Sequence, residues 1–286
     1  MTNNIKPIVQ TALNHQLSID MRYEPSDIKK VTGERRLHCT ILYCARFGVV
    51  SPTFLSWLYG ISHSLCLEHL NRLVRLQLLK VFPTIRVPGG RVYILTLSGA
   101  KFAEELLGQH VPFRSSSNPE FQVNQNSLMH DVILQFALSI GIQHIDSHGK
   151  YSPLWMGFVT EKEFKRLFPS SAIRNVDGLI SEADGTLCAV ELEHSFKPIQ
   201  LRKNILLRYL DALRMGLYEK VFFISQSERI LNDIKRVNAV AMDNLQSTSD
   251  KKSNNLLLSS QDRKLLEKRL IYRTKFCGQI TDLFYR

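Results

Sequence analysis

The segment 175–197, NVDGLISEADGTLCAVELEHSFK, determines more of the expected fold than any other part of the chain. It contains two runs with apolar residues, Val176–Ser181 and Thr186–Glu193, joined by a short turn with Asp184 and Gly185. Apolar runs on either side of an Asp-Gly pair are typical of a β-hairpin. The sequence therefore predicts two antiparallel strands at this point.

The register of this hairpin brings acidic residues together. Folding about Asp184 predicts Asp177 to lie opposite Glu191, and Glu193 lies two residues further along the same face. Three carboxylates in an otherwise apolar hairpin are costly to bury unless a metal ion or a basic side chain neutralises them. We expect a metal site here, and an exposed acidic edge that aids solubility is the alternative.

Length and composition set broad limits on the protein. The 286 residues suffice for two domains. The five cysteines are odd in number and include no CxxC pair, which argues against a disulfide framework or a zinc site and favours a reducing cytoplasm. No apolar run approaches the ~18 residues of a membrane span. We therefore expect a cytoplasmic protein without a membrane span.

The net charge of +11 is unevenly distributed. Residues 1–110 carry a net charge of +6, residues 111–194 carry −4, and residues 195–286 carry +9. Two basic regions around an acidic centre suit a polyanion bound near a site that needs a cation. Simple solubility would explain the same charges.

Residues 35–110 have the spacing of three helices followed by a β-hairpin. We expect helices over Arg35–Phe47, over 52–59 and over His63–Gln77, and a hairpin with a Gly-rich tip over 79–97. This order predicts a winged helix-turn-helix, in which the last helix enters the major groove of DNA. A winged helix used only for protein contacts is the alternative.

The polar face of the third helix and the hairpin tip supply the expected DNA contacts. Basic residues beside the tip favour DNA, since a solvated turn does not need such charge. The predicted DNA-binding residues are Ser62, His63, Ser64, His69, Arg72, Arg75, Arg86 and Arg91.

The remaining chain is expected to form an α/β domain with a central mixed sheet, because helices and strands alternate around the acidic hairpin. A long helix opened by Pro198 follows the hairpin, and KVFFIS at 220–225 reads as a buried strand. The expected limits are an extension over 1–34, the winged helix over 35–110, a linker over 111–124, the α/β domain over 125–243 and a basic C-terminal extension over 244–286.

The acidic residues suit a hard divalent cation. Asp177, Glu191 and the backbone carbonyl of Leu192 are the expected ligands of Mg²⁺ or Mn²⁺, which would activate a phosphodiester for cleavage. Glu193 is the expected base or second-metal ligand, and Lys197 is expected to neutralise the phosphate.

Three further residues are weaker candidates. His130, followed by Asp131 in an apolar helix, is expected to act as a base or second-shell acid if that helix packs beside the sheet, and a hydrogen-bonded structural histidine is the alternative. Tyr209 is a candidate nucleophile and Lys203 a candidate phosphate contact, although a tyrosine among apolar neighbours is more often part of the core.

The arrangement resembles the PD-(D/E)xK nuclease superfamily. Val176-Asp177-Gly178 corresponds to the PD element and Glu191-Leu192-Glu193 to the (D/E)xK element, with Val176 in place of proline and Glu193 in place of lysine. With a winged helix in front, residues 35–225 look like plasmid relaxases of the MOBC type, which belong with the replication-relaxation proteins. The resemblance implies a restriction-endonuclease-like fold.

The same resemblance implies a metal-dependent relaxase that nicks one strand at the transfer origin of a plasmid or mobile element, the first step of conjugation. Its implied partners are the origin DNA and other relaxosome or coupling proteins. Two alternatives stay open, namely a DNA-binding accessory or regulatory protein with an inactive nuclease fold and a site-specific double-strand endonuclease.

Overall fold

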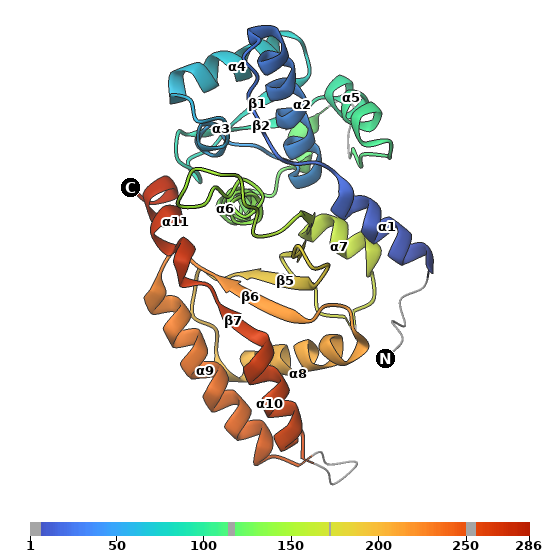
Figure 1. Ribbon diagram of the computed structural model, residues 1–286, viewed down its shortest axis with the longest axis vertical. Coiled ribbons are helices and arrows are strands. Elements are labelled where there is room, and N and C mark those ends of the chain that lie inside the picture. Colours follow the sequence, from blue (N-terminus) through green and yellow to red (C-terminus); the bar gives the residue numbers. More distant parts are fainter. Residues whose placement is uncertain (1–6, 114–117, 172, 250–255) are drawn as a thin grey trace. The chain divides into compact units, whose positions relative to one another are not determined.

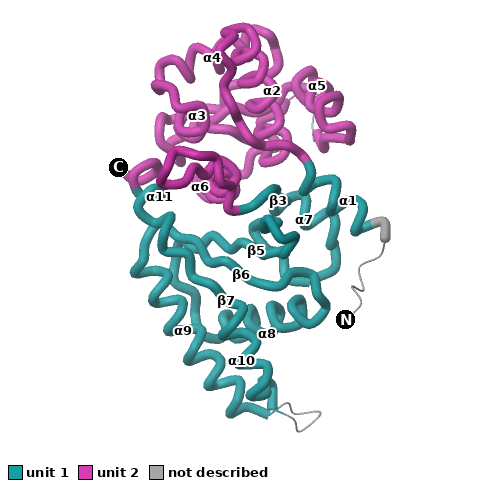
Figure 2. Tube along the Cα trace, viewed as in Figure 1, with its two compact units in different colours: residues 1–18, 155–281 teal, residues 19–154, 282–286 magenta. Residues whose placement is uncertain are grey.

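The computed structural model describes residues 7–113, 118–171, 173–249 and 256–286 (Figure 1). The chain divides into two compact units, coloured separately in Figure 2. Unit 1 comprises Met1–Ser18 and Trp155–Thr281, and unit 2 comprises Ile19–Leu154 and Asp282–Arg286. No helix in the described part of the chain is both long enough and apolar enough to cross a membrane.

These units divide at different residues from the domain limits expected from the sequence. The expected linker 111–124, of which 114–117 lie outside the described residues, falls within unit 2, as do residues 125–154. Residues 7–18 and 244–281, expected as extensions, belong to unit 1 as far as they are described. Composition marks loops, whereas contacts between distant segments decide which elements form one core.

Unit 1 is built on a mixed five-stranded sheet of order β3-β4-β5-β6-β7. The first three strands are antiparallel neighbours, and β5, β6 and β7 run parallel. The strands are β3 (Gly157–Thr160), β4 (Gly178–Ser181), β5 (Leu187–Leu192), β6 (Lys220–Ile224) and β7 (Leu270–Tyr272). The expected α/β domain with a mixed sheet is therefore confirmed at this level.

The parallel part of the sheet requires long connections, and helices supply them. α8 connects β5 to β6, and α9 and α10 lie between β6 and β7 in the sequence (Figure 1). α8 packs against both α9 and α10. The helices of this unit are α1 (Pro7–Ser18), α7 (Glu161–Leu167), α8 (Ile199–Met215), α9 (Glu228–Gln246) and α10 (Ser260–Arg269), and α11 (Cys277–Phe284), preceded by the 3₁₀ turn Thr274–Phe276, begins in unit 1.

The β4–β5 hairpin has the register that the sequence predicts. Gly178 pairs with Val190 and Ser181 with Leu187, and the ladder ends there, with Asp177 just before β4 and Glu191 just after Val190 in β5. The turn is closed by the bond from Glu182 N to Thr186 O, and Gly185 adopts φ 83°, which favours glycine. The prediction of this hairpin is confirmed.

Unit 2 contains three helices and a hairpin in the order expected over residues 35–97, although the first helix begins earlier, at Lys29, and a further helix follows the hairpin. Ser51 and Ser62 cap two of the helices by accepting bonds from Phe54 N and Leu65 N, and Gly60 between them has φ 61°. The elements are α2 (Lys29–Phe47), α3 (Pro52–Tyr59), α4 (His63–Arg75), β1 (Leu79–Pro83), β2 (Arg91–Leu95) and α5 (Leu97–Leu107).

Unit 2 ends with the 3₁₀ helix Pro119–Gln122 and α6 (Leu128–Ser139). α6 packs against α2 and α3, and Gln135 Nε2 donates to Val49 O over 2.7 Å in the core. Most of α6 is buried, since residues 132–139 carry apolar or hydrogen-bonded side chains. Its contacts with α2 and α3 group α6 with the helical unit, whereas its residues were expected in the α/β domain.

Candidate functional site

The acidic hairpin, which we define as residues 177–193, carries its acids at the open end of the β4–β5 pair. Asp177 precedes β4, and its Oδ2 accepts a bond of 2.7 Å from Leu192 N. The N–H and C=O of one strand residue point to the same edge of the strand. The Leu192 carbonyl therefore faces the Asp177 side, which matches the expected grouping of these two residues with Glu191.

Glu191 is buried and is paired with a base. Its side chain lies in β5, the central strand, and only 2% of the residue is exposed. Arg174 binds it in a bidentate manner, with Nε 2.9 Å from Oε1 and Nη2 2.7 Å from Oε2. Burial and the neighbouring Asp177 raise the pKa of Glu191 to about 7, against the opposing effect of Arg174.

Glu193 is also buried and has two basic neighbours. Lys197 Nζ lies 2.7 Å from Oε2, and Arg202 Nη1 lies 2.9 Å from Oε1. Arg202 belongs to α8 and is 1% exposed, as is Glu193. The Arg202 contact is held by charge, because its atoms do not meet hydrogen-bond geometry. To neutralise a phosphate, as expected, Lys197 would therefore have to leave its ion pair with Glu193.

Glu191 and Glu193 are thus neutralised by bases in this structure, whereas Asp177 accepts a backbone hydrogen bond from Leu192 N. The sequence predicted that either a metal ion or basic side chains would neutralise the buried carboxylates. In this structure the basic side chains are Arg174, Lys197 and Arg202. Within the described residues of unit 1, no three His, Cys, Asp or Glu side chains bring ligand atoms within 4.8 Å of one another. The acids also do not form an exposed edge, because β5 is covered on both faces.

The donor atoms nevertheless suit a divalent cation. Carboxylate and carbonyl oxygens are the ligands that Mg²⁺ and Mn²⁺ prefer, and Asp177, Glu191 and Leu192 offer them at one strand end. Both oxygens of Glu191 are engaged by Arg174. The residues therefore fit such an ion by donor type, on the condition that Arg174 releases Glu191.

Tyr209 is not available as a nucleophile in this structure. It lies on the inner face of α8 with no exposed surface, and the Arg174 guanidinium lies 5.1 Å from its ring centroid. Burial raises the pKa of Tyr209 well above its ordinary value, which opposes a phenolate. Its burial agrees with the alternative of a core tyrosine, and the role of a nucleophile stays a prediction. Lys203, on the same helix, is half-buried.

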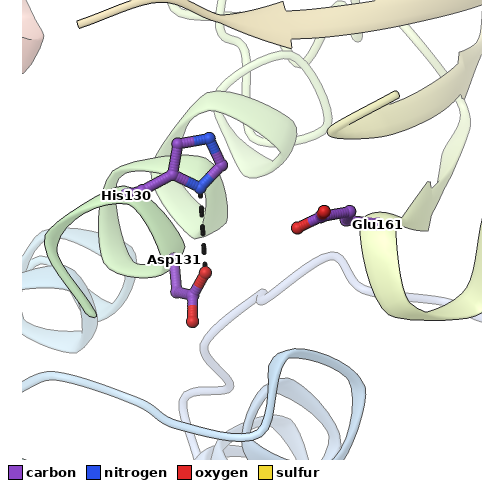
Figure 3. A group of neighbouring side chains, drawn as sticks. All are labelled: His130, Asp131 and Glu161. Carbon is purple, nitrogen blue, oxygen red and sulfur yellow. Dashed lines mark ion pairs between the residues drawn. The ribbon is translucent and has the colours of Figure 1, made fainter. Parts of the chain in front are cut away.

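His130 lies in unit 2, whereas the acidic hairpin lies in unit 1. The helix that carries His130 is α6, which is grouped with unit 2. His130 is half-buried, and its Nδ1 lies 3.7 Å from Asp131 Oδ1 (Figure 3). Asp131 also accepts from Ser127 Oγ over 3.1 Å, a contact within the first turn of α6. The distance of 3.7 Å between His130 and Asp131 is an ion-pair distance, longer than a hydrogen bond, and the acid–base role of His130 stays a prediction.

The predicted DNA-binding residues of α4 fall into two groups. His63, Ser64, Arg72 and Arg75 are exposed along one side of the helix, together with the capping Ser62. The fold therefore leaves this polar side accessible within unit 2.

His69 does not belong to that exposed group. It is half-buried, with Nε2 3.0 Å from Thr40 Oγ1 and its ring edge-on to Tyr59. Burial, followed by the charges of Arg36 and Arg72, lowers the pKa of His69 to about 4. His69 lies on the side of α4 that faces Thr40 of α2, so it is less accessible than the exposed group, and its contact with DNA stays a prediction.

The basic hairpin, which we define as residues 79–95, presents its charges to solvent. Arg86 and Arg91 flank the tip, are exposed, and form no ion pair with any described residue. Both were predicted to contact DNA, and their exposure is compatible with that role.

Two residues of the acidic cluster were missed from the sequence. Arg174 lies in the loop before β4, three residues ahead of Asp177, and Arg202 lies in α8, nine residues after Glu193. A basic residue just before an acidic strand is a usable signal for Arg174. Arg202 gives no such signal, because one arginine among four basic residues of an amphipathic helix does not reveal which of them is buried.

No protein-family model matches this chain, and neither curated proteins nor solved structures include one that is detectably similar.

Proposed function

We propose that this protein is a DNA-binding nickase, in which unit 2 binds DNA as a winged helix and the acidic hairpin of unit 1 cleaves one strand with the help of Mg²⁺ or Mn²⁺. The observation that carries the proposal is the β4–β5 register together with the bond from Leu192 N to Asp177 Oδ2, which brings Asp177 to the strand end that holds Glu191 and Leu192. The order of three antiparallel strands, a helix and a parallel strand supports a PD-(D/E)xK type of fold.

The chain's own residues would prepare the site. Arg174 would release Glu191, which then joins Asp177 and the Leu192 carbonyl as an oxygen ligand. Lys197, which is partly exposed, would turn from Glu193 towards a phosphate. A bound divalent cation in such a site polarises the scissile phosphate and lowers the pKa of an attacking water. By resemblance, the substrate is the transfer origin of a mobilisable element, with relaxosome or coupling proteins as partners.

A nicking assay tests this proposal. A supercoiled plasmid that carries the DNA flanking the protein's own gene is incubated with the protein and Mg²⁺ or Mn²⁺, and open circles are expected. Glu191→Gln should abolish nicking and leave DNA binding intact. Glu182→Gln, in the same hairpin but outside the cluster, is the matched control. Equal nicking by the wild type and Glu191→Gln would refute the assignment. Denaturing gels of both strands separate a nickase from a double-strand endonuclease.

The second candidate is a DNA-binding accessory or regulatory protein with an inactive nuclease fold. The observation that favours it is the closed set of ion pairs, since Glu191 and Glu193 are both buried and neutralised by the protein's own bases. Calorimetry with Mn²⁺ distinguishes the two candidates. Binding that is lost in Asp177→Ala supports the nickase, and the absence of binding supports the inactive fold.

A further inference from the structure

The tip of the basic hairpin, residues 84–90, has a defined shape. Thr84 N donates to Gly90 O over 3.0 Å, Gly90 N donates to Val87 O over 3.2 Å, and Arg86 N donates to Thr84 Oγ1 over 3.1 Å. Val87 is 6% exposed and anchors the loop to the core of unit 2. The loop therefore holds its outward-facing side chains in a fixed place.

Ile85 is the outward-facing residue of this loop. It is 98% exposed, more than any other large apolar side chain among the described residues, of which the next are Phe121 at 70% and Ile28 at 62%. Isolated apolar residues on a surface are ordinary, so exposure alone needs no explanation. What requires one is a stiff, β-branched side chain fully presented by an anchored loop, directly beside Arg86.

The surroundings of Ile85 are positively charged. Residues 62–96 contain five basic residues and one acidic residue, Glu68. One of the five, Lys80, pairs with Glu120, and the others are exposed. The tip also approaches the start of α4, because a Cβ atom on Gly89 would lie 3.5 Å from His63 Cε1.

This combination fits duplex DNA better than a protein surface. Exposed arginines attract phosphates, whereas the core of a protein interface is depleted of charge and needs a contiguous apolar area. DNA-binding proteins that bend the double helix insert single apolar side chains between base pairs and hold the adjacent phosphates with basic residues. Ile85 beside Arg86 and Arg91 has the composition of such a wedge.

We propose that Ile85 enters a base-pair step of duplex DNA through the minor groove and partly unstacks it, while Arg86 and Arg91 contact the flanking phosphates. The protein would then kink and unwind the DNA that it binds. This inference rests on the proposed DNA binding by unit 2 and does not depend on cleavage by unit 1. It adds a deformation of the DNA, and hence a preference for flexible pyrimidine–purine steps.

The test measures unwinding without metal ions. The full-length protein is bound to a closed circular plasmid in EDTA, the plasmid is relaxed with a type IB topoisomerase that requires no metal, and the topoisomers are separated on a gel. The wild type should shift the distribution to lower linking number. Ile85→Ala should lose the shift and Ile85→Phe should retain it. Ile28→Ala removes an equally apolar exposed residue elsewhere in unit 2 and should behave as the wild type.

Binding is measured in parallel by fluorescence anisotropy on a mixed-sequence duplex of about 30 base pairs. Ile85→Ala should change the Kd by less than about tenfold, because the contacts of a wedge are offset by the cost of unstacking. If the wild type binds no duplex, the proposed function fails and this inference with it. If the wild type binds and Ile85→Ala unwinds DNA equally well, the wedge is refuted while DNA binding stands. An Ile85→Ala protein that changes only its oligomeric state would also refute it.

Discussion

The charged side chains of the two hairpins differ in burial and in ion pairing. In the acidic hairpin, Glu191 and Glu193 are almost fully buried, and each is paired with basic side chains. In the basic hairpin, Arg86 and Arg91 are exposed and form no ion pair among the described residues. The acidic hairpin supplies the central strand of a sheet covered on both faces, whereas the basic hairpin is a two-stranded sheet with a solvated tip.

The difference shows what each set of charges contributes. A buried charge must be paired, and removal of its partner leaves an uncompensated charge in a medium of low polarity. An exposed charge is solvated and contributes little to stability, so it remains free to meet a ligand. Mutations of the two hairpins should therefore affect different quantities.

The largest effect on stability is expected from Arg202→Met. This change leaves the buried Glu193 with Lys197 alone, and it should lower the free energy of unfolding by about 3 kcal/mol. Urea denaturation measures it. Arg86→Met, the same substitution in the basic hairpin, should change it by less than about 0.5 kcal/mol. Recovery in the double variant Arg202→Met with Glu193→Gln would identify the unpaired charge as the cause. Equal stability of the two single variants would contradict the comparison.

The second effect is a pH dependence caused by His69. Its pKa is lowered to about 4 in the folded protein, from an ordinary value of 6.5. Above pH 6.5 the imidazole is neutral in both states and stability is complete. As the pH falls towards 4, His69 becomes protonated in the unfolded chain but stays largely neutral in the folded protein. The free energy of unfolding therefore falls by up to about 3 kcal/mol.

Denaturation curves at pH 7 and pH 4.5 check this dependence. His69→Gln should reduce the difference between the two curves, whereas His63→Gln, at an exposed position of the same helix, should not. If His69→Gln shows the same loss of stability between pH 7 and pH 4.5 as the wild type, His69 is solvated and belongs with the exposed residues of α4.

A smaller effect should be common to both hairpins. Gly185 and Gly90 adopt φ values of 83° and 68°, which L side chains rarely adopt. A Cβ atom would meet nothing closer than 4.0 Å at either position, so the cost of Gly185→Ala or Gly90→Ala is that of the backbone alone, about 1 kcal/mol each. Thermal unfolding of the two variants measures it. An unchanged melting temperature in Gly185→Ala would show that the turn accommodates the added Cβ atom without strain.

The smallest effect on stability, and a clear one on binding, is expected at Arg86. Arg86→Met should reduce by about 1 the slope of the logarithm of the DNA affinity against the logarithm of the salt concentration, since one phosphate contact is lost. Anisotropy titrations over a series of salt concentrations measure this slope. Lys30→Met, an exposed basic residue in α2, is the control. An unchanged slope in Arg86→Met would remove this residue from the DNA contact.

Local signals predicted the elements of the fold well. The Asp-Gly turn predicted the register of the acidic hairpin, and the sequence predicted the starts of the helices at residues 52 and 63, where Ser51 and Ser62 act as caps. These features depend on neighbours in the sequence. The unit that contains α6 depends on distant contacts, and its apolar pattern, which fits burial against any partner, did not reveal them.

The candidate site was predicted in part. The sequence predicted that Asp177 lies opposite Glu191 and that three acids would need neutralisation. It did not reveal that Arg174 pairs with Glu191 or that Arg202 pairs with Glu193, because Arg202 reaches Glu193 only when α8 packs on the sheet. The same reason explains Tyr209, whose place in the core depends on which side of α8 meets β5 and β6.

The sequence by itself therefore determined the hairpins, their turns and the list of acids, since turn chemistry and two-residue periodicity act over short distances. Only the tertiary structure decided which charges are buried, which are paired and which are left to solvent. Burial depends on how the helices cover the sheet. Because a buried carboxylate must be paired, the carboxylates that the helices cover form ion pairs with basic side chains.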